Sequence, residues 1–261
     1  MEHVTNAGED AGRLLAFALN PTLRPAHDDD YADLAGRYRV DPLLRALTDA
    51  VAKGLGLMVL DSSDQGLVLG AQDGSPFAMK LSDYRASMSL EERVCHGLIQ
   101  LALAAWCFPT AADLDDPDGA VKKVSASQVT AYLVRLAEAL DARAAEDDVA
   151  GATPELEMAW QAVLSRARTK ATADGRRAPK TLVAMVAYAL ERLEKGGLVR
   201  RVSDDDGGVW KTLSRYRVQV RELAAHRAFA LVLDAGRDAA RDRDDDGEDD
   251  VLPLTTASLP S

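Results

Sequence analysis

The sequence predicts a mainly α-helical protein with small β-hairpins, which places it in the α+β class. Hydrophobic residues make up 47% of the 261 residues and charged residues 28%, so the chain can bury a hydrophobic core. Aromatic residues are only 5%, so this core must consist largely of Leu, Ala and Val, and Leu and Ala are strong helix formers. Apolar residues recur at helical spacing in most segments, and only a few short apolar runs have strand character.

Composition divides the chain into two helical domains and a tail. Ala144–Thr153 is rich in Asp, Ala and Gly, which is typical of a linker. The acidic run Asp242–Asp250 cannot bury itself, so we expect disorder there. Such a tail either keeps the protein in solution or docks on a partner, for example by mimicking DNA. The predicted parts are a flexible N-terminus at 1–10, an N-terminal domain at 11–143, a linker at 144–153, a C-terminal domain at 154–236 and a disordered acidic tail at 237–261.

The N-terminal domain is predicted to form helices, then a β-hairpin, then further helices. Asp41 is an N-cap residue, Pro42 occupies the first helical position, where a missing N–H costs nothing, and Gly54 ends that helix. Ser89 and Glu92 have the spacing of a capping box. The other predicted elements are helices at 12–19 and 31–38, strands at 55–60 and 66–70 around a polar turn, a helix up to Pro109, a strand at 122–124, and a helix to about Ala142 capped by Ser127.

The C-terminal domain repeats the order of helices followed by a hairpin. Gly196 and Gly197 end its central helix, and an Asp-rich tip separates two short apolar runs. The predicted elements are a helix from Pro154, a basic loop to Lys180, a helix at 181–195, strands at 198–202 and 209–213, and a helix at about 214–233. Helices followed by a hairpin are the order of a winged-helix unit, in which the hairpin is the wing. The predicted architecture is therefore two winged-helix units in tandem.

We find no pattern that predicts catalysis, a metal or a cofactor, so the chain is not expected to be an enzyme. The four histidines lack metal-ligand spacing, and His96 and its neighbour Cys95 point about 100° apart on a helix. Cys95 and Cys107 lie about 18 Å apart along one predicted helix, too far for a disulfide, so we expect buried thiols in a reducing cytoplasm. The acidic residues at 113–118 lack the register of a calcium loop. Neither a membrane-spanning run nor a secretion signal is expected.

Basic residues around the second hairpin are the candidates for contacts with DNA phosphates. They are Arg176, Arg177, Lys180, Arg200, Arg201, Lys211, Arg215 and Arg217. Two features oppose this: the formal net charge of −11, and the acidic tip at Asp204–Asp206, which would repel a DNA backbone. Ordinary surface charge is the alternative. The first hairpin carries Asp61 and Asp64 near its tip and no Lys or Arg, which favours packing on a protein partner.

A loose local pattern marks the first part of the chain. It consists of Ala11–Leu15, Pro21–Leu23, an acidic patch before Tyr31, Arg37–Pro42 and Gly54–Val59. With the layout of helices and hairpins over about Ala11 to Leu233, this pattern resembles the MukE-like kite subunits of bacterial SMC complexes, which are found in condensins and in Wadjet (Jet) plasmid-defence systems. The resemblance implies a dimeric, cytoplasmic, nucleoid-associated subunit that binds a kleisin-like protein joining the SMC ATPase heads and helps to clamp double-stranded DNA. It leaves open whether the role is chromosome organisation or plasmid defence.

The main alternative is a winged-helix transcription regulator that binds promoter DNA. Such a protein needs a basic recognition helix, and the predicted helix at 181–195 offers mainly Arg192 and Lys195 against Glu191 and Glu194. An accessory or toxin-neutralising protein is a third possibility, indicated only by the acidic tail. We expect a homodimer with weak, salt-sensitive affinity for DNA.

Overall fold

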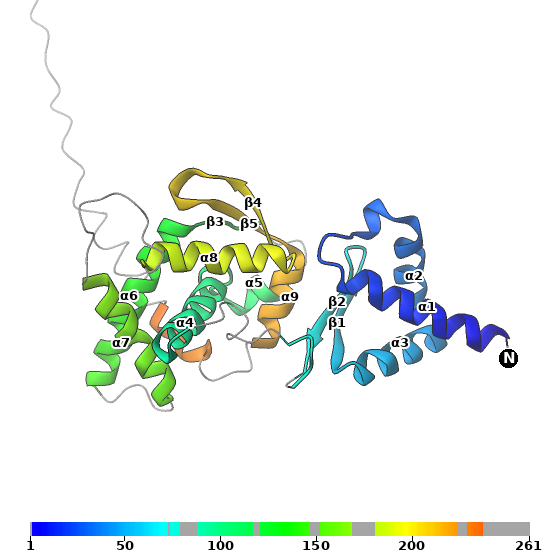
Figure 1. Ribbon diagram of the computed structural model, residues 1–261, viewed down its shortest axis with the longest axis horizontal. Helices are drawn as coiled ribbons and strands as arrows, with labels where there is room; N and C mark the ends of the chain where they lie inside the picture. Colours follow the sequence, from blue (N-terminus) through cyan, green and yellow to red (C-terminus); the bar gives the residue numbers. More distant parts are fainter. Residues whose placement is uncertain are drawn as a thin grey trace, which may run out of the picture.

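The computed structural model describes residues 2–72, 74–78, 88–116, 121–146, 152–168, 181–223 and 229–236. The protein is mostly helical with small antiparallel sheets, which confirms the predicted α+β class (Figure 1). In chain order the elements are α1 (Glu2–Leu19), η1 (Pro25–His27), α2 (Asp29–Val40), α3 (Pro42–Gly54), β1 (Leu57–Ser63), β2 (Gly66–Ala71), α4 (Leu90–Cys107), α5 (Ala111–Asp115), β3 (Lys123–Ser125), α6 (Ala126–Ala145), α7 (Pro154–Arg168), α8 (Leu182–Lys195), β4 (Val199–Ser203), η3 (Asp205–Gly207), β5 (Val209–Thr212) and α9 (Ser214–Leu223).

Residues 2–72, here called the first unit, form three helices followed by the β1–β2 hairpin. The carboxylate of Asp41 accepts hydrogen bonds from the backbone N–H groups of Leu43 and Leu44, so the predicted cap of α3 is confirmed. The buried ring of Tyr31 lies between the helices and the hairpin, and its hydroxyl accepts the Leu67 N–H at 3.0 Å. This bond fixes the hairpin against α2.

The described residues from 88 to 236, here called the second unit, share one hydrophobic core. Helix α4 packs against α7, and α6 packs against both α7 and α8. The buried cluster runs from Cys95 to Ala235 and includes Trp160 and Trp210. A three-stranded antiparallel sheet in the order β3-β5-β4 lies along α8, so the short strand before α6 pairs with the last strand of the hairpin (Figure 1).

This core does not follow the predicted boundaries. The linker predicted at 144–153 falls inside the second unit, because α6 and α7 pack on each other across it. The hydrophobic cores divide instead between β2 and α4. The N-terminus predicted to be flexible is helical from Glu2, since Ala7 and Asp10 are buried and Asp10 pairs with Arg37 at 2.8 Å.

Three further predictions need correction or lie outside the described residues. The N-cap of α6 is Ser125, whose side chain accepts the Gln128 N–H at 3.1 Å, and not Ser127. Within the helix predicted at 214–233, the structure describes α9 and helical residues at 229–236, and residues 224–228 lie outside the described residues. The acidic tail at 237–261 lies outside the described residues.

The two units meet where β2 runs beside α9. The side chains of Arg215 and Gln219 donate to the carbonyl oxygens of Leu67 and Leu69, each at 3.4 Å. These bonds cover carbonyl groups on the free edge of β2, which protects that edge from pairing with other strands. At the other end of the junction, Gly197 has a φ of +69°, and a Cβ there would lie 2.4 Å from the carbonyl oxygen of Pro21. Glycine therefore permits the turn after α8 to approach the first unit closely.

Within the described residues, every helix is too short or too polar to span a lipid bilayer.

Candidate nucleic-acid interface

The outer face of the three-stranded sheet carries a row of basic side chains. In the strand register, Lys123 of β3 lies opposite Lys211 of β5, and Lys211 lies opposite Arg200 of β4. Residues directly opposite each other in antiparallel strands point to the same face, so these three side chains share one face. Lys123 and Arg200 are exposed and Lys211 is half-buried. Among the described residues, none of the three forms an ion pair, so the row presents uncompensated positive charge.

The opposite face of the sheet explains why the basic row points outward. Val124 and Trp210, the neighbours of Lys123 and Lys211 along their strands, are fully buried in the core. Alternation along a strand then sends the next side chain to the solvent. The indole N–H of Trp210 donates to Glu194 of α8 at 3.3 Å, which holds the sheet in register on that helix.

The acidic tip of the second hairpin is largely engaged within the protein. The hydroxyl of Ser125 donates to the Asp206 carboxylate at 2.6 Å, and the hydroxyl of Ser127 donates to it as well. These hydrogen bonds lower the pKa of Asp206 below its usual value, and the bond from Ser125 has the largest effect. Asp204 pairs with Arg201 at 2.6 Å. Two of the three carboxylates expected to repel DNA therefore have partners, and the tip opposes DNA less than its sequence predicts.

The predicted basic residues thus fall into separate environments. Arg200, Lys211 and Arg217 are exposed or half-buried and form no ion pair with any described residue. Arg201 lies with its guanidinium 5.1 Å from the centre of the Trp210 ring and pairs with Asp204, so it belongs to the hairpin's own packing. Arg215 is only 6% exposed and lies at the junction of the two units. The predicted residues Arg176, Arg177 and Lys180 lie outside the described residues.

A polar groove of about 710 Å³ continues from the sheet into the junction between the units. One wall is the tip of the first hairpin, and the other consists of the end of β5 and the start of α9. Its charged lining residues are Arg24, Asp61, Asp64, Asp115, Lys211, Arg215, Arg217 and Arg221. Positive side chains outnumber carboxylates here, and Asp64 is already paired with Arg39 at 2.7 Å. The groove is therefore electropositive although the whole chain is acidic.

Sequence reasoning did not single out Lys123, Arg24 or Arg221. The spacing of Arg217 and Arg221, four residues apart on a helix, was a usable signal, because such residues share one helix face. No local signal could have placed Lys123 beside Lys211, since the two strands are joined by most of the second unit. Arg24 reaches the groove through the turn after α1.

Helix α8 is poorly suited to reading bases in the major groove. Between Leu182 and Glu194 none of its residues is exposed, because the core covers one side and the sheet lies along another. Glu194 is itself bound by the Arg201 N–H at 2.8 Å and by Trp210. In the first unit, α3 exposes the apolar Leu43 and Val51, which cannot hydrogen-bond a base edge. Its exposed Arg45 and Asp49 are already hydrogen-bonded to α2, which leaves Lys53 as its other exposed charged side chain. Phosphate contacts therefore fit the described surface better than base contacts.

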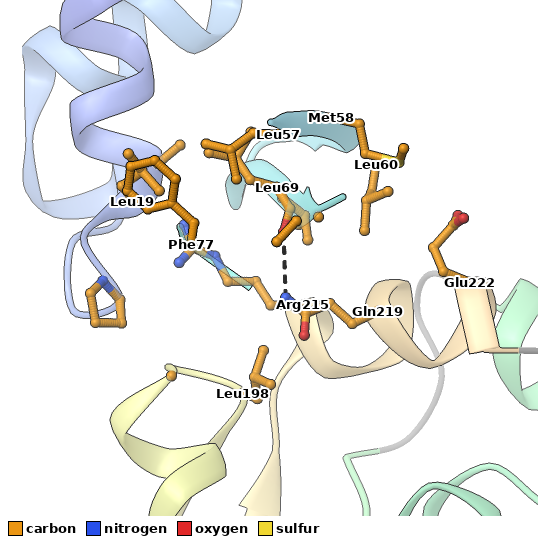
Figure 2. A pocket seen from close by; sticks show the side chains of 16 residues that line it. Leu19, Leu57, Met58, Leu60, Leu69, Phe77, Leu198, Arg215, Gln219 and Glu222 are labelled. Atoms are coloured by element: carbon orange, nitrogen blue, oxygen red, sulfur yellow. Dashed lines mark hydrogen bonds between the residues drawn. The ribbon is translucent and has the colours of Figure 1, made fainter. Parts of the chain in front are cut away.

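A second, more apolar cavity of about 510 Å³ lies between the same units (Figure 2). Leu57 and Leu69 of the first hairpin face Leu198 across it, and the dashed hydrogen bond from Gln219 to Leu69 crosses it. Phe77 closes one side and is 46% exposed.

The two cysteines and Asp113, whose side chains could take part in chemistry, have structural roles. Burial raises the pKa of the Cys95 thiol to about 11 and that of Cys107 to about 12, so both stay protonated and unreactive at neutral pH. Asp113 forms a capping box with Thr110 at the start of α5 and pairs with Lys122 at 3.2 Å. Within the described residues, no group of three or more potential ligands is placed to hold a metal ion.

Comparison with protein-family models, with curated proteins and with solved structures finds no match for this chain.

Proposed function

We propose that this chain is a non-catalytic DNA-binding subunit of the kite type, built from two winged-helix units. The observation that carries the proposal is the basic row of Lys123, Lys211 and Arg200 on the outer face of the sheet. Lys and Arg side chains without carboxylate partners bind the phosphate backbone of DNA, whatever its sequence. This contact belongs to the second unit, and the groove beside it extends the positive surface to the first.

The order of elements supports the winged-helix interpretation of both units. In the second unit the short strand β3 precedes the helices α6, α7 and α8. It pairs with β5, the final strand of the hairpin, as the first strand of a winged helix does. The first unit has three helices followed by a hairpin. Two such units in one chain are the layout on which the resemblance to kite subunits rests.

The proposal includes the partners that this resemblance implies. The subunit would act as a homodimer on the nucleoid and bind a kleisin-like protein, and its DNA contacts would help an SMC ATPase to clamp double-stranded DNA. Chromosome organisation and plasmid defence are both compatible with these contacts. The covered α8 argues against the alternative, a regulator that reads promoter bases.

The direct test measures the affinity of the full chain for unrelated 20-base-pair duplexes as a function of salt. We expect similar affinities for all duplexes and a steep loss with salt, because counterions are released from the DNA. The double variant Lys123→Gln, Arg200→Gln removes two exposed charges and should lower the slope of log affinity against log salt by about 2. Lys53→Gln, at an exposed position on the first unit, is the matched control and should change nothing.

Two results would contradict the proposal. One is a wild-type chain that binds no duplex even at low salt. The other is a strong preference for a single sequence, which would favour the regulator. Purification of the tagged chain from its host tests the partners separately: recovery of a kleisin-like protein with a coiled-coil ATPase supports the kite assignment, and recovery of the chain alone opposes it.

A further inference from the structure

The groove between the two units contains a buried arginine whose hydrogen-bonding capacity is not filled. Arg215 is 94% buried, and only one of its nitrogens, Nη2, makes a hydrogen bond, a long one of 3.4 Å to the Leu67 carbonyl oxygen. Its Nε is buried without a hydrogen-bond partner. Leaving a buried charged donor unsatisfied is costly, so such groups are normally found bound to an acceptor.

A second arginine lies close by and is held without any carboxylate. Arg24 donates from Nη1 to the carbonyl oxygens of Pro21 and Leu23, at 2.9 and 2.7 Å, and from Nη2 to that of Gly197 at 3.5 Å. Burial lowers the pKa of Arg24 below its usual value, and the positive charge of Arg215 lowers it further. Two like charges are thus held near each other by backbone acceptors alone.

The rim of the groove adds further positive groups from α9. Arg217 and Arg221 lie one turn apart on the helix face that lines the groove, and neither forms an ion pair with a described residue. Ser214, the first residue of α9, lines the groove as well. The first N–H groups of a helix have no partner within the helix, and they favour a negative charge placed before them. All these groups are donors that suit an anion.

From this arrangement we infer that the groove binds a phosphate group, held by Arg215 and Arg24 at its base and by Arg217 and Arg221 at its rim. A phosphate offers several oxygen acceptors and matches the fork of a guanidinium. The inference deepens the proposed function, because one source of this phosphate is the DNA backbone. The other source is a free molecule that carries a pyrophosphate group. Since Arg24 belongs to the first unit and Arg215 to the second, the bound phosphate ties the two units together.

The carboxylates of the groove do not cancel this charge. Asp64 is occupied by Arg39 on the side of α2. Asp61 and Asp115 line the groove without forming an ion pair with any described residue, and the positive side chains Arg24, Lys211, Arg215, Arg217 and Arg221 outnumber them. These two carboxylates favour a small ligand, because they would repel an extended polyanion that fills the groove, whereas a single phosphate can bind without contacting them.

The test uses the full chain and inorganic pyrophosphate, titrated by calorimetry at constant ionic strength. We expect one pyrophosphate per chain. The double variant Arg217→Gln, Arg221→Gln should bind at least about tenfold more weakly, because each arginine supplies a charge-assisted hydrogen bond. Arg215→Lys keeps the charge but loses the buried Nε–H, and should weaken binding about tenfold with an unchanged circular dichroism spectrum. Lys53→Gln serves as the control with unchanged affinity.

Competition with DNA identifies the source of the phosphate. If the groove takes the DNA backbone, pyrophosphate displaces a blunt duplex without terminal phosphates, and Arg217→Gln, Arg221→Gln weakens duplex binding. If the groove binds a free molecule, the variant Arg217→Gln, Arg221→Gln binds the duplex as the wild type does, but binds pyrophosphate more weakly.

The inference is overturned if pyrophosphate does not bind, or binds the wild type and Arg217→Gln, Arg221→Gln equally. That result leaves the proposed function intact provided that duplex binding still depends on Lys123 and Arg200. Conversely, pyrophosphate binding without any duplex binding would contradict the proposed function and support the phosphate site in the groove.

Discussion

The hydrophobic cores of the two units differ in size and continuity. In the first unit the buried side chains fall into two small clusters, one around Tyr31 and Leu14 and one around Leu15 and Leu57, with the half-buried Leu69 touching both. In the second unit one continuous cluster holds nearly all buried side chains. A domain of about 70 residues buries a smaller share of its surface than one of about 150 and is correspondingly less stable. The first unit therefore depends on its contacts with the second.

The surfaces of the two hairpins differ as clearly as the cores. The first hairpin carries Asp61 and Asp64 and donates no positive charge to the groove, whereas the second carries the row of Lys123, Lys211 and Arg200. The two hairpins thus have opposite electrostatic character. Under the proposed function, this difference places the DNA contact on the second unit and leaves the first for a protein partner.

The largest effect is expected from emptying the core of the second unit. Trp210→Ala removes a fully buried ring and should lower the free energy of unfolding by about 3–5 kcal/mol. Urea unfolding followed by circular dichroism measures this loss as a lower midpoint of the upper transition. Leu14→Ala, a fully buried position of the first unit, should shift the lower transition alone. Val202→Ala, exposed on the same hairpin as Trp210, is the control. A single transition that responds to both core variants would show that the units do not differ in stability.

A smaller effect is expected from separating the two units. Gly197→Ala places a side chain at a φ of +69°, which costs about 1–2 kcal/mol, and drives its Cβ against the Pro21 carbonyl oxygen. We expect a lower midpoint for the first unit and a larger radius of gyration in X-ray scattering. Gly196→Ala is the matched control, because Gly196 has an ordinary helical φ of −79° and a Cβ there meets nothing closer than 3.5 Å. Equal behaviour of the two variants would mean that this turn does not join the units.

The smallest effect concerns the tip of the first hairpin. Arg39 pairs with Asp64 at 2.7 Å, but the two side chains are 43% and 87% exposed. Arg39→Gln should therefore cost only about 0.2–1 kcal/mol, measured on the lower urea transition. The loss should disappear in 1 M NaCl, where screening acts over about 3 Å. A loss that persists at high salt would mean that the hairpin is held by more than this exposed pair.

Several local features were predictable because their causes are local. The capping box of Ser89 and Glu92 forms as predicted, as does the cap provided by Asp41. Both hairpins lie within three residues of their predicted positions. The cap of α6 was misplaced because Ser125 and Ser127 are equally good candidates in sequence, and only the contact of Ser127 with Asp206 separates them.

The domain boundary and part of the candidate site were not predictable in this way. A run of Asp, Ala and Gly at 144–153 marks a loop in the sequence, but a loop between helices of one core and a linker between two domains have the same composition. Arg215 was predicted to face DNA, and its burial follows from the docking of α9 on β2, which no periodicity along α9 reveals.

By itself, the sequence determined most of the helices, the two hairpins and the caps at Asp41 and Ser89, because spacing and capping act over a few residues. Only the tertiary structure decided that α4 and α6 share a core with α7 and α8, and that Lys123, Lys211 and Arg200 form one row. The physical reason is that burial and strand register are set by partners far apart in the chain. A basic residue becomes part of a surface only when its neighbours on the strand are buried.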